Sequence, residues 1–465
     1  MKRITFSILL LSVICGLVIP TTQYANAANG KCISKGSTVK EYQSWTPVCI
    51  KNGGGEFFAA LGTLLNDPKY KLPYEKTSIS NVLPKTPGVL KVGNLNADSC
   101  KIESPSTQGL RKGFGNQGAR GISAGATLQV IPIQASDAIS SGNPSVDYKT
   151  FFSDLKDYTV KLSEGRWNYQ INIPNTYVKL PKSLASYKMG AVYNRGEEKN
   201  PYQVKFVSAA LKAAVGSLDI ERADMYMFVA PPSTSSGLFV RFSNTFDIKF
   251  KESSYVKAFS ITRTDLATGS AHHDFFHLGL GIPDHYGDEK YNGQDSAQFI
   301  GSTGEILGTD RWGNMSGTHM DWLSWDKWIA NFLDDSQVIC SKIESESTFW
   351  IKPSAVFGSD QKVLIIPTGK HSALAVESMR SVGYNSLIPK SLMGALVYSI
   401  DLTKSEFGAG FNVIRPKSRI KSPTTFPLPG DDALRKGDSI TFKGYKITVV
   451  EAGDFGDVVK VEKTS

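Results

Sequence analysis

A cluster of histidines is the strongest chemical signal in this sequence of 465 residues. The chain has six histidines, and four of them lie between residues 272 and 285. Neutral imidazole is the commonest metal ligand among protein side chains. His273 and His277 are four residues apart, so a helix over this stretch would place both rings on one face, about one turn apart. The spacing predicts that the two side chains bind one metal ion.

The residues between and after these histidines indicate a zinc site that activates water. Catalytic Zn²⁺ usually has three protein ligands and one open position, where a nearby carboxylate deprotonates bound water. Asp274 occupies the place that Glu has in the His-Glu-x-x-His pattern. Asp284 and His285 are the candidate third ligands, because Gly279 and Gly281 can end the helix and turn the chain back toward the metal. His272 points away from the paired histidines and is expected to be solvated or to support the ligands indirectly.

The start of the chain has the pattern of a secretory signal peptide over residues 1–27. A basic pair, Lys2 and Arg3, precedes an apolar run over residues 4–19, and Ala-Asn-Ala at 25–27 is a cleavage signal. No later stretch reaches the ~18 apolar residues that a membrane span needs. We therefore expect a soluble, secreted protein without a stable membrane anchor.

The charge of the chain argues against nucleic acid as a partner. The formal net charge of +9 becomes +7 when the two basic residues of the signal peptide are removed. That excess is small for this length, and no basic and aromatic cluster suggests a nucleic-acid groove. Weak association with an anionic cell envelope is the expectation that remains.

Four cysteines remain after the signal peptide, which contains Cys15. An even number in an exported protein indicates two disulfides, with three possible connectivities. Cys32 with Cys49 is the favoured local pair, and Cys100 with Cys340 would then join the front of the main domain to its end.

The alternation of strand and helix patterns predicts an α+β fold with more than one domain. Residues 28–105 are assigned to a small disulfide-pinned N-terminal module and lead-in, 106–345 to the catalytic domain, and 346–465 to an all-β, sandwich-like domain. Strands are expected over residues 128–133, 167–178, 225–230, 237–264 (as a hairpin), 363–367, 373–377, 394–400, 438–442, 445–451 and 458–462. Helices are expected over residues 147–162, 204–215, from about 270 through the histidine pair, and 320–332, the last as an amphipathic helix rich in tryptophan.

Several stretches together resemble the immune inhibitor A family of secreted zinc metallopeptidases. They are residues 128–137, 273–287 (HDFFHLGLGIPDHYG), 312–315, 324–335, 372–389 and 394–401, so the likeness spans about residues 125–402. The resemblance implies a metzincin-like catalytic domain with a mixed sheet. It also implies His273, His277 and Asp284 as zinc ligands, Asp274 as general base, and Met315 as the turn beneath the metal.

The sequence departs from the family pattern at two places. The family's Glu is Asp274 here, and Asp is one methylene shorter. The stretch from His277 to Asp284 is one residue longer than in the family, with Leu280 where the turn glycine should stand. A misplacement of about 1 Å can lower a rate on the order of 100-fold, so the short side chain bears directly on turnover.

Three functions follow from these patterns. The first is an endopeptidase that acts on protein or peptide substrates with Zn²⁺. The second is a zinc-binding pseudopeptidase that serves as a cell-surface or protein-binding module. In the third, the histidines fill a core and bind no metal, since such pairs also arise by chance on helices. The loop with Asp288, Glu289 and Asp295 is a candidate Ca²⁺ site.

Overall fold

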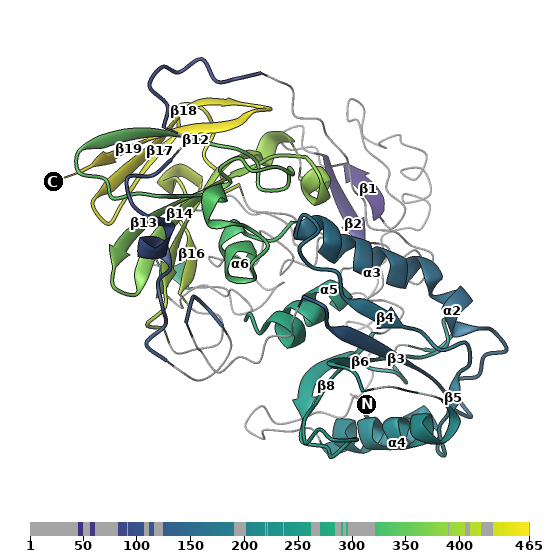
Figure 1. Ribbon diagram of the computed structural model, residues 1–465. Coiled ribbons are helices and arrows are strands. Elements are labelled where there is room, and N and C mark those ends of the chain that lie inside the picture. The colour runs from purple at the N-terminus through teal and green to yellow at the C-terminus, as the bar shows by residue number, and fades with distance from the viewer. Residues whose placement is uncertain are drawn as a thin grey trace, which may run out of the picture.

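The computed structural model (Figure 1) covers the chain in segments. The described residues are 45–49, 56–60, 82–90, 92–106, 111–115, 124–189, 201–218, 220, 222–235, 237–261, 270–283, 290–291, 294–295, 321–388, 390–404, 410–419 and 431–464. The fold is mixed α+β with several sheets and few helices among these residues, in agreement with the predicted class.

A six-stranded sheet forms the first half of the described structure. Its order is β4-β3-β6-β8-β7, and β5 also pairs with β3. All neighbours are parallel except β7, an antiparallel edge strand beside β8. The strands are β3 (Thr127–Gln134), β4 (Gln170–Asn172), β5 (Val178–Lys179), β6 (Met225–Val229), β7 (Phe242–Phe246) and β8 (Val256–Ile261). Every residue of β6 is buried, as expected for a strand that is covered on both faces.

Helices cover the two faces of this sheet separately (Figure 1). α3 (Lys149–Leu162) and α5 (Ser270–Phe275) pack on one face, where Leu128 and Val130 of β3 enter a shared core. α4 (Pro201–Ser217) packs on the other face in a separate core. The short helix α2 (Pro144–Asp147) precedes α3, and Asn143 caps it by accepting from the Ser145 amide.

Two further sheets follow in the chain and share one core. The five-stranded sheet has the order β11-β13-β14-β15-β16, and the four-stranded sheet has the order β12-β19-β18-β17. Ile339 and Leu364 of the first sheet lie in the same buried cluster as Phe349 and Val459 of the second. The strands are β11 (Val338–Cys340), β12 (Glu346–Ile351), β13 (Val363–Gly369), β14 (Ser372–Met379), β15 (Gly394–Asp401), β16 (Phe411–Val413), β17 (Ser439–Phe442), β18 (Tyr445–Gly453) and β19 (Gly456–Lys463).

Residues 82–90 and 92–106 pack on these later sheets, although the sequence assigns them to the N-terminal module and lead-in. The Leu90 amide donates to the Thr348 carbonyl, and the Leu95 amide donates to the Cys340 carbonyl. The turn η2 (Ala97–Cys100) ends at a disulfide between Cys100 and Cys340, with sulfur atoms 2.07 Å apart. The expected pairing of these two cysteines is thus present. Two short antiparallel pairs, β1 (Trp45–Cys49) with β2 (Glu56–Ala60) and β9 (Lys290–Tyr291) with β10 (Gln294–Asp295), complete the strands.

The tryptophan-rich helix differs from its prediction. α6 spans Ser324–Ile329, so it is shorter than the expected 320–332, and it is buried on every side, including Asp326 and Lys327. Trp322 and Phe332 join the core beneath α3 and α5, whereas Trp325 and Trp328 join the core of the five-stranded sheet. The prediction of an amphipathic helix is therefore wrong, because two cores enclose this segment and leave it no side that faces solvent.

The other predicted elements mostly agree with the structure. The strand expected over 167–178 forms only as the short β4 and β5, with irregular chain between them. α5 begins at Ser270, in agreement with the helix start expected near residue 270. In the described part of the chain, no helix combines the length and the apolar character needed to cross a membrane.

Candidate metal centre

His273 and His277 converge as the sequence predicts. The two Nε2 atoms lie 2.9 Å apart, and the ring planes are nearly perpendicular at 87°. His273 belongs to α5, whereas His277 belongs to a π-helical segment, Phe276–Leu280, that continues it. Single π turns inside helices occur frequently at functional sites. Both rings are only partly buried, so a ligand from solvent can reach the shared space.

A glycine turn fixes the orientation of the His277 ring. Gly281 has φ +72°, a left-handed conformation that other residues adopt only with strain. The turn brings the Ile282 carbonyl oxygen to 2.7 Å from His277 Nδ1. A carbonyl only accepts hydrogen bonds, so Nδ1 carries a proton, and in the neutral ring Nε2 then presents its lone pair to His273 Nε2. Metal-binding histidines in proteins are commonly oriented by this kind of backbone contact.

The pair fits a Zn²⁺ ion as two of its ligands. Zn–N bonds of 2.0–2.1 Å at tetrahedral angles place two nitrogens about 3.3 Å apart. The distance of 2.9 Å between the two Nε2 atoms is within about half an ångström of that value. Two imidazoles with one ring nitrogen each in a common space are chemically suited to zinc.

Asp274 is buried beside the pair. Its side chain is 2% exposed, and one carboxylate oxygen lies 4.0 Å from Nε of Arg241, a side chain that is 42% exposed. No motif in the sequence indicates a role for Arg241. The Asp274 carboxylate therefore lies next to the guanidinium of Arg241, the residue that directly precedes β7.

His272 lies in the core and not in solvent. It is 4% exposed, and its ring packs against Tyr158 of α3 with centroids 4.1 Å apart. Burial lowers the pKa of His272 to about 3, so this imidazole is neutral near pH 7. The prediction of a solvated side chain is wrong, because α5 buries this face against α3.

The remaining predicted site residues lie outside the described residues. They are Asp284, His285, Asp288, Glu289, Met315 and Cys32, together with the side chains of Cys49 and Asp295. Among the residues that are described, no three His, Cys, Asp or Glu side chains form a group that could hold a metal ion. The described part of the candidate centre is thus a pair of histidines with one neighbouring carboxylate.

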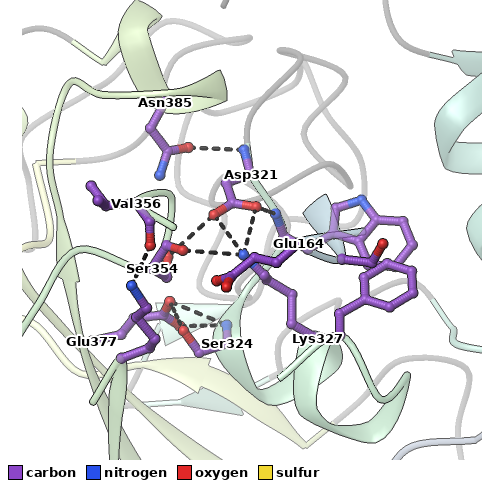
Figure 2. A network of polar contacts seen from close by, with 12 residues as sticks. Glu164, Asp321, Ser324, Lys327, Ser354, Val356, Glu377 and Asn385 are labelled. Carbon is purple, nitrogen blue, oxygen red and sulfur yellow. Dashed lines mark hydrogen bonds and ion pairs between the residues drawn. The ribbon is translucent and has the colours of Figure 1, made fainter. Parts of the chain in front are cut away.

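A buried polar network joins α6 and the residues beside it to the five-stranded sheet (Figure 2). Lys327 of α6 donates to both carboxylate oxygens of Asp321, at 3.2 and 3.1 Å, and both side chains are nearly inaccessible. Glu377 of β14 accepts from the amide and hydroxyl of Ser324, the first residue of α6, and from the Tyr398 hydroxyl. A carboxylate at a helix start also meets the positive end of the helix dipole. These contacts fix α6 to the sheet.

Sequence reasoning missed this network, although one signal was available. Glu377 is the one charged residue in the otherwise apolar or small run of β14, SALAVESM. A charge in such a run predicts a buried group that must have hydrogen-bond partners.

Comparison with known proteins adds no assignment. No protein-family model matches the chain, and no match was found among curated proteins.

Proposed function

We propose that the protein is a secreted, zinc-dependent endopeptidase whose metal is held by His273 and His277. The observation that carries the proposal is the convergence of the two Nε2 atoms at 2.9 Å, with the His277 ring held by the Ile282 carbonyl. The finer architecture belongs to the same proposal. The six-stranded sheet with α5 would be a metzincin-like domain, followed by a C-terminal β domain.

Each candidate residue has a role in this proposal. When bound, zinc lowers the pKa of its water toward ~7 and polarises the substrate carbonyl. With zinc bound, Asp274 would serve as the general base that takes a proton from the attacking water and delivers it to the leaving amine. From the resemblance, Asp284 would complete the ligand set, with His285 as the alternative, and Met315 would form the turn beneath the metal. The resemblance of residues 273–287 to a metallopeptidase motif supports these roles.

A pseudopeptidase is the second candidate, and one observation favours it. Asp274 is buried and 4.0 Å from Arg241, so its carboxylate already faces a cation. An ion pair can be purely structural, and the Asp side chain is one methylene shorter than the Glu of the usual pattern. In this alternative the histidine pair binds zinc, and the surface binds a protein without cleaving it.

Metal analysis tests the ligand assignment. Purified protein should contain about one zinc per chain, and the His273→Ala and His277→Ala variants should lose most of it. His371→Ala is the matched control, because His371 lies away from the pair and contacts the Glu103 carbonyl. Equal zinc contents in all four proteins would refute the assignment.

Proteolysis of denatured casein or gelatin then separates the two candidates. The endopeptidase predicts cleavage that a zinc chelator abolishes and that added zinc restores. A protein that binds zinc stoichiometrically but leaves both substrates intact would be the pseudopeptidase.

A further inference from the structure

A hollow of about 630 Å³ lies on the far side of the six-stranded sheet from the histidine pair. Its walls are α4 and residues 181–188, a segment that includes the short turn η3 (Leu184–Tyr187). Tyr187 packs edge-on against Phe206 of α4, with ring centroids 5.7 Å apart, which fixes one wall against the other. The volume is in the range of ordinary ligand pockets.

Four lysines line this hollow: Lys182, Lys188, Lys205 and Lys212. All four are exposed, and no acidic side chain is among the lining residues that the structure describes. None of the four forms an ion pair with a carboxylate in that part of the chain. Lys205 and Lys212 are seven residues apart on α4, so they share a face and are separated by about 10 Å along the helix axis. The hollow therefore concentrates positive charge over an extended strip.

Tyr187, in the wall of this hollow, supplies a second and independent observation. The residue is 7% exposed, and its hydroxyl has no hydrogen-bond partner among the described residues. An unsatisfied buried hydroxyl costs about 1–3 kcal/mol, so such groups nearly always have a partner in the functional state. Because Tyr187 is among the residues that line the hollow, a ligand oxygen there is a candidate partner for the hydroxyl.

We propose that this hollow binds an anionic ligand with two or more phosphate groups spaced over about 10 Å. The lysine ammonium groups contact phosphate oxygens as point charges, and the Tyr187 hydroxyl donates to one of them. A single phosphate would leave much of the strip unused, whereas an oligophosphate or adjacent lipid headgroups would contact both α4 lysines. The site is separate from the histidine pair and does not rest on the proposed peptidase function.

Titration calorimetry with inorganic tripolyphosphate tests the proposal on the full chain. Wild type should bind, and the double variant Lys205→Gln/Lys212→Gln should bind roughly 100-fold more weakly, through two lost charge-assisted contacts. The control is Lys149→Gln/Lys156→Gln, which removes the same charge at the same spacing from α3. This control should change the affinity by less than roughly threefold, because charges farther from the ligand than the Debye length of about 10 Å are largely screened. Equal losses in the two double variants would overturn the proposal.

Two further arms complete the test. The Tyr187→Phe variant keeps the packing on Phe206 and should bind tripolyphosphate roughly tenfold more weakly. An unchanged affinity would show that the Tyr187 hydroxyl does not contact the ligand. Vesicles of phosphatidylglycerol in phosphatidylcholine distinguish the sources of phosphate. Vesicle binding that only the α4 double variant loses indicates lipid headgroups, and tripolyphosphate binding alone indicates a soluble ligand. If wild type binds neither probe, the site does not exist.

Discussion

Glu377 should make the stability of this protein fall as the pH rises through the neutral range. The side chain is fully buried in β14, and its hydrogen bonds come from Ser324 and Tyr398. Burial raises the pKa of Glu377 to about 7, and the hydrogen bonds offset only part of that effect. Replacing Glu377 with Gln removes the titrating proton while nearly preserving the shape of the side chain.

The expected magnitude follows from linkage between protonation and folding. The unfolded chain has an ordinary carboxyl pKa of 4.5, so between pH 4.5 and 7 the folded state binds the proton more tightly. The stabilisation from this group is complete below pH 4.5 and is lost as the pH rises through the folded value of about 7. Over that window the loss is about 3 kcal/mol, and above it the stability should depend no further on this group.

Urea unfolding at a series of pH values measures the effect. The difference in unfolding free energy between wild type and Glu377→Gln should decrease by about 3 kcal/mol from pH 4.5 to pH 7.5. Glu344→Gln is the matched control, because the same chemical change is then made at an exposed position. A difference that stays constant across the series, or that grows with pH, would show that burial of Glu377 does not favour its protonated form.

Three more predictions test other features of the chain. The Asp274→Asn variant should retain zinc but lose proteolytic activity, because an amide cannot accept the proton. The Asp274→Glu variant should be more active than wild type if the short reach of the Asp side chain is all that limits the rate. Full activity of the Asn variant would show that another residue is the general base. Gly93→Ala should destabilise the protein by 1 kcal/mol or more in thermal unfolding, since its Cβ would lie 1.7 Å from the Cys340 carbonyl oxygen. The control Gly216→Ala meets no atom within 4 Å and should be neutral or mildly stabilising, so equal losses at the two glycines would refute the packing argument. Changing Cys100 and Cys340 to Ser should cost up to about 5 kcal/mol in the chain-entropy model, and an unchanged unfolding midpoint would show that the bond does not constrain the unfolded chain.

Local patterns predicted much of the fold. β3 and β6 are short apolar runs, and α4 has an alanine-rich helical pattern, so single segments carried enough information. The convergence of His273 and His277 followed from their spacing alone. These features depend on contacts within about one turn or one strand.

Features that depend on distant partners could not be predicted in the same way. α6 is short and wholly buried because two separate cores enclose it, and its own sequence resembles a longer amphipathic helix. The bond from Ser324 to Glu377 joins residues 53 positions apart. The Ile282 carbonyl that orients His277 is a backbone group, and no side-chain pattern indicates it.

The Cys100–Cys340 bond also determines how the chain would carry a mechanical load. The two cysteines are 240 residues apart, and the six-stranded sheet with the histidine pair lies inside the loop that they close. A force pulling on the two ends of the chain would pass through the sulfur atoms and bypass that loop. At ~3.4 Å per extended residue, the bond withholds about 800 Å of chain from extension. Stretching the oxidised protein would unfold only the segments that precede Cys100 and follow Cys340. The histidine pair would therefore bear no tension until the disulfide is reduced.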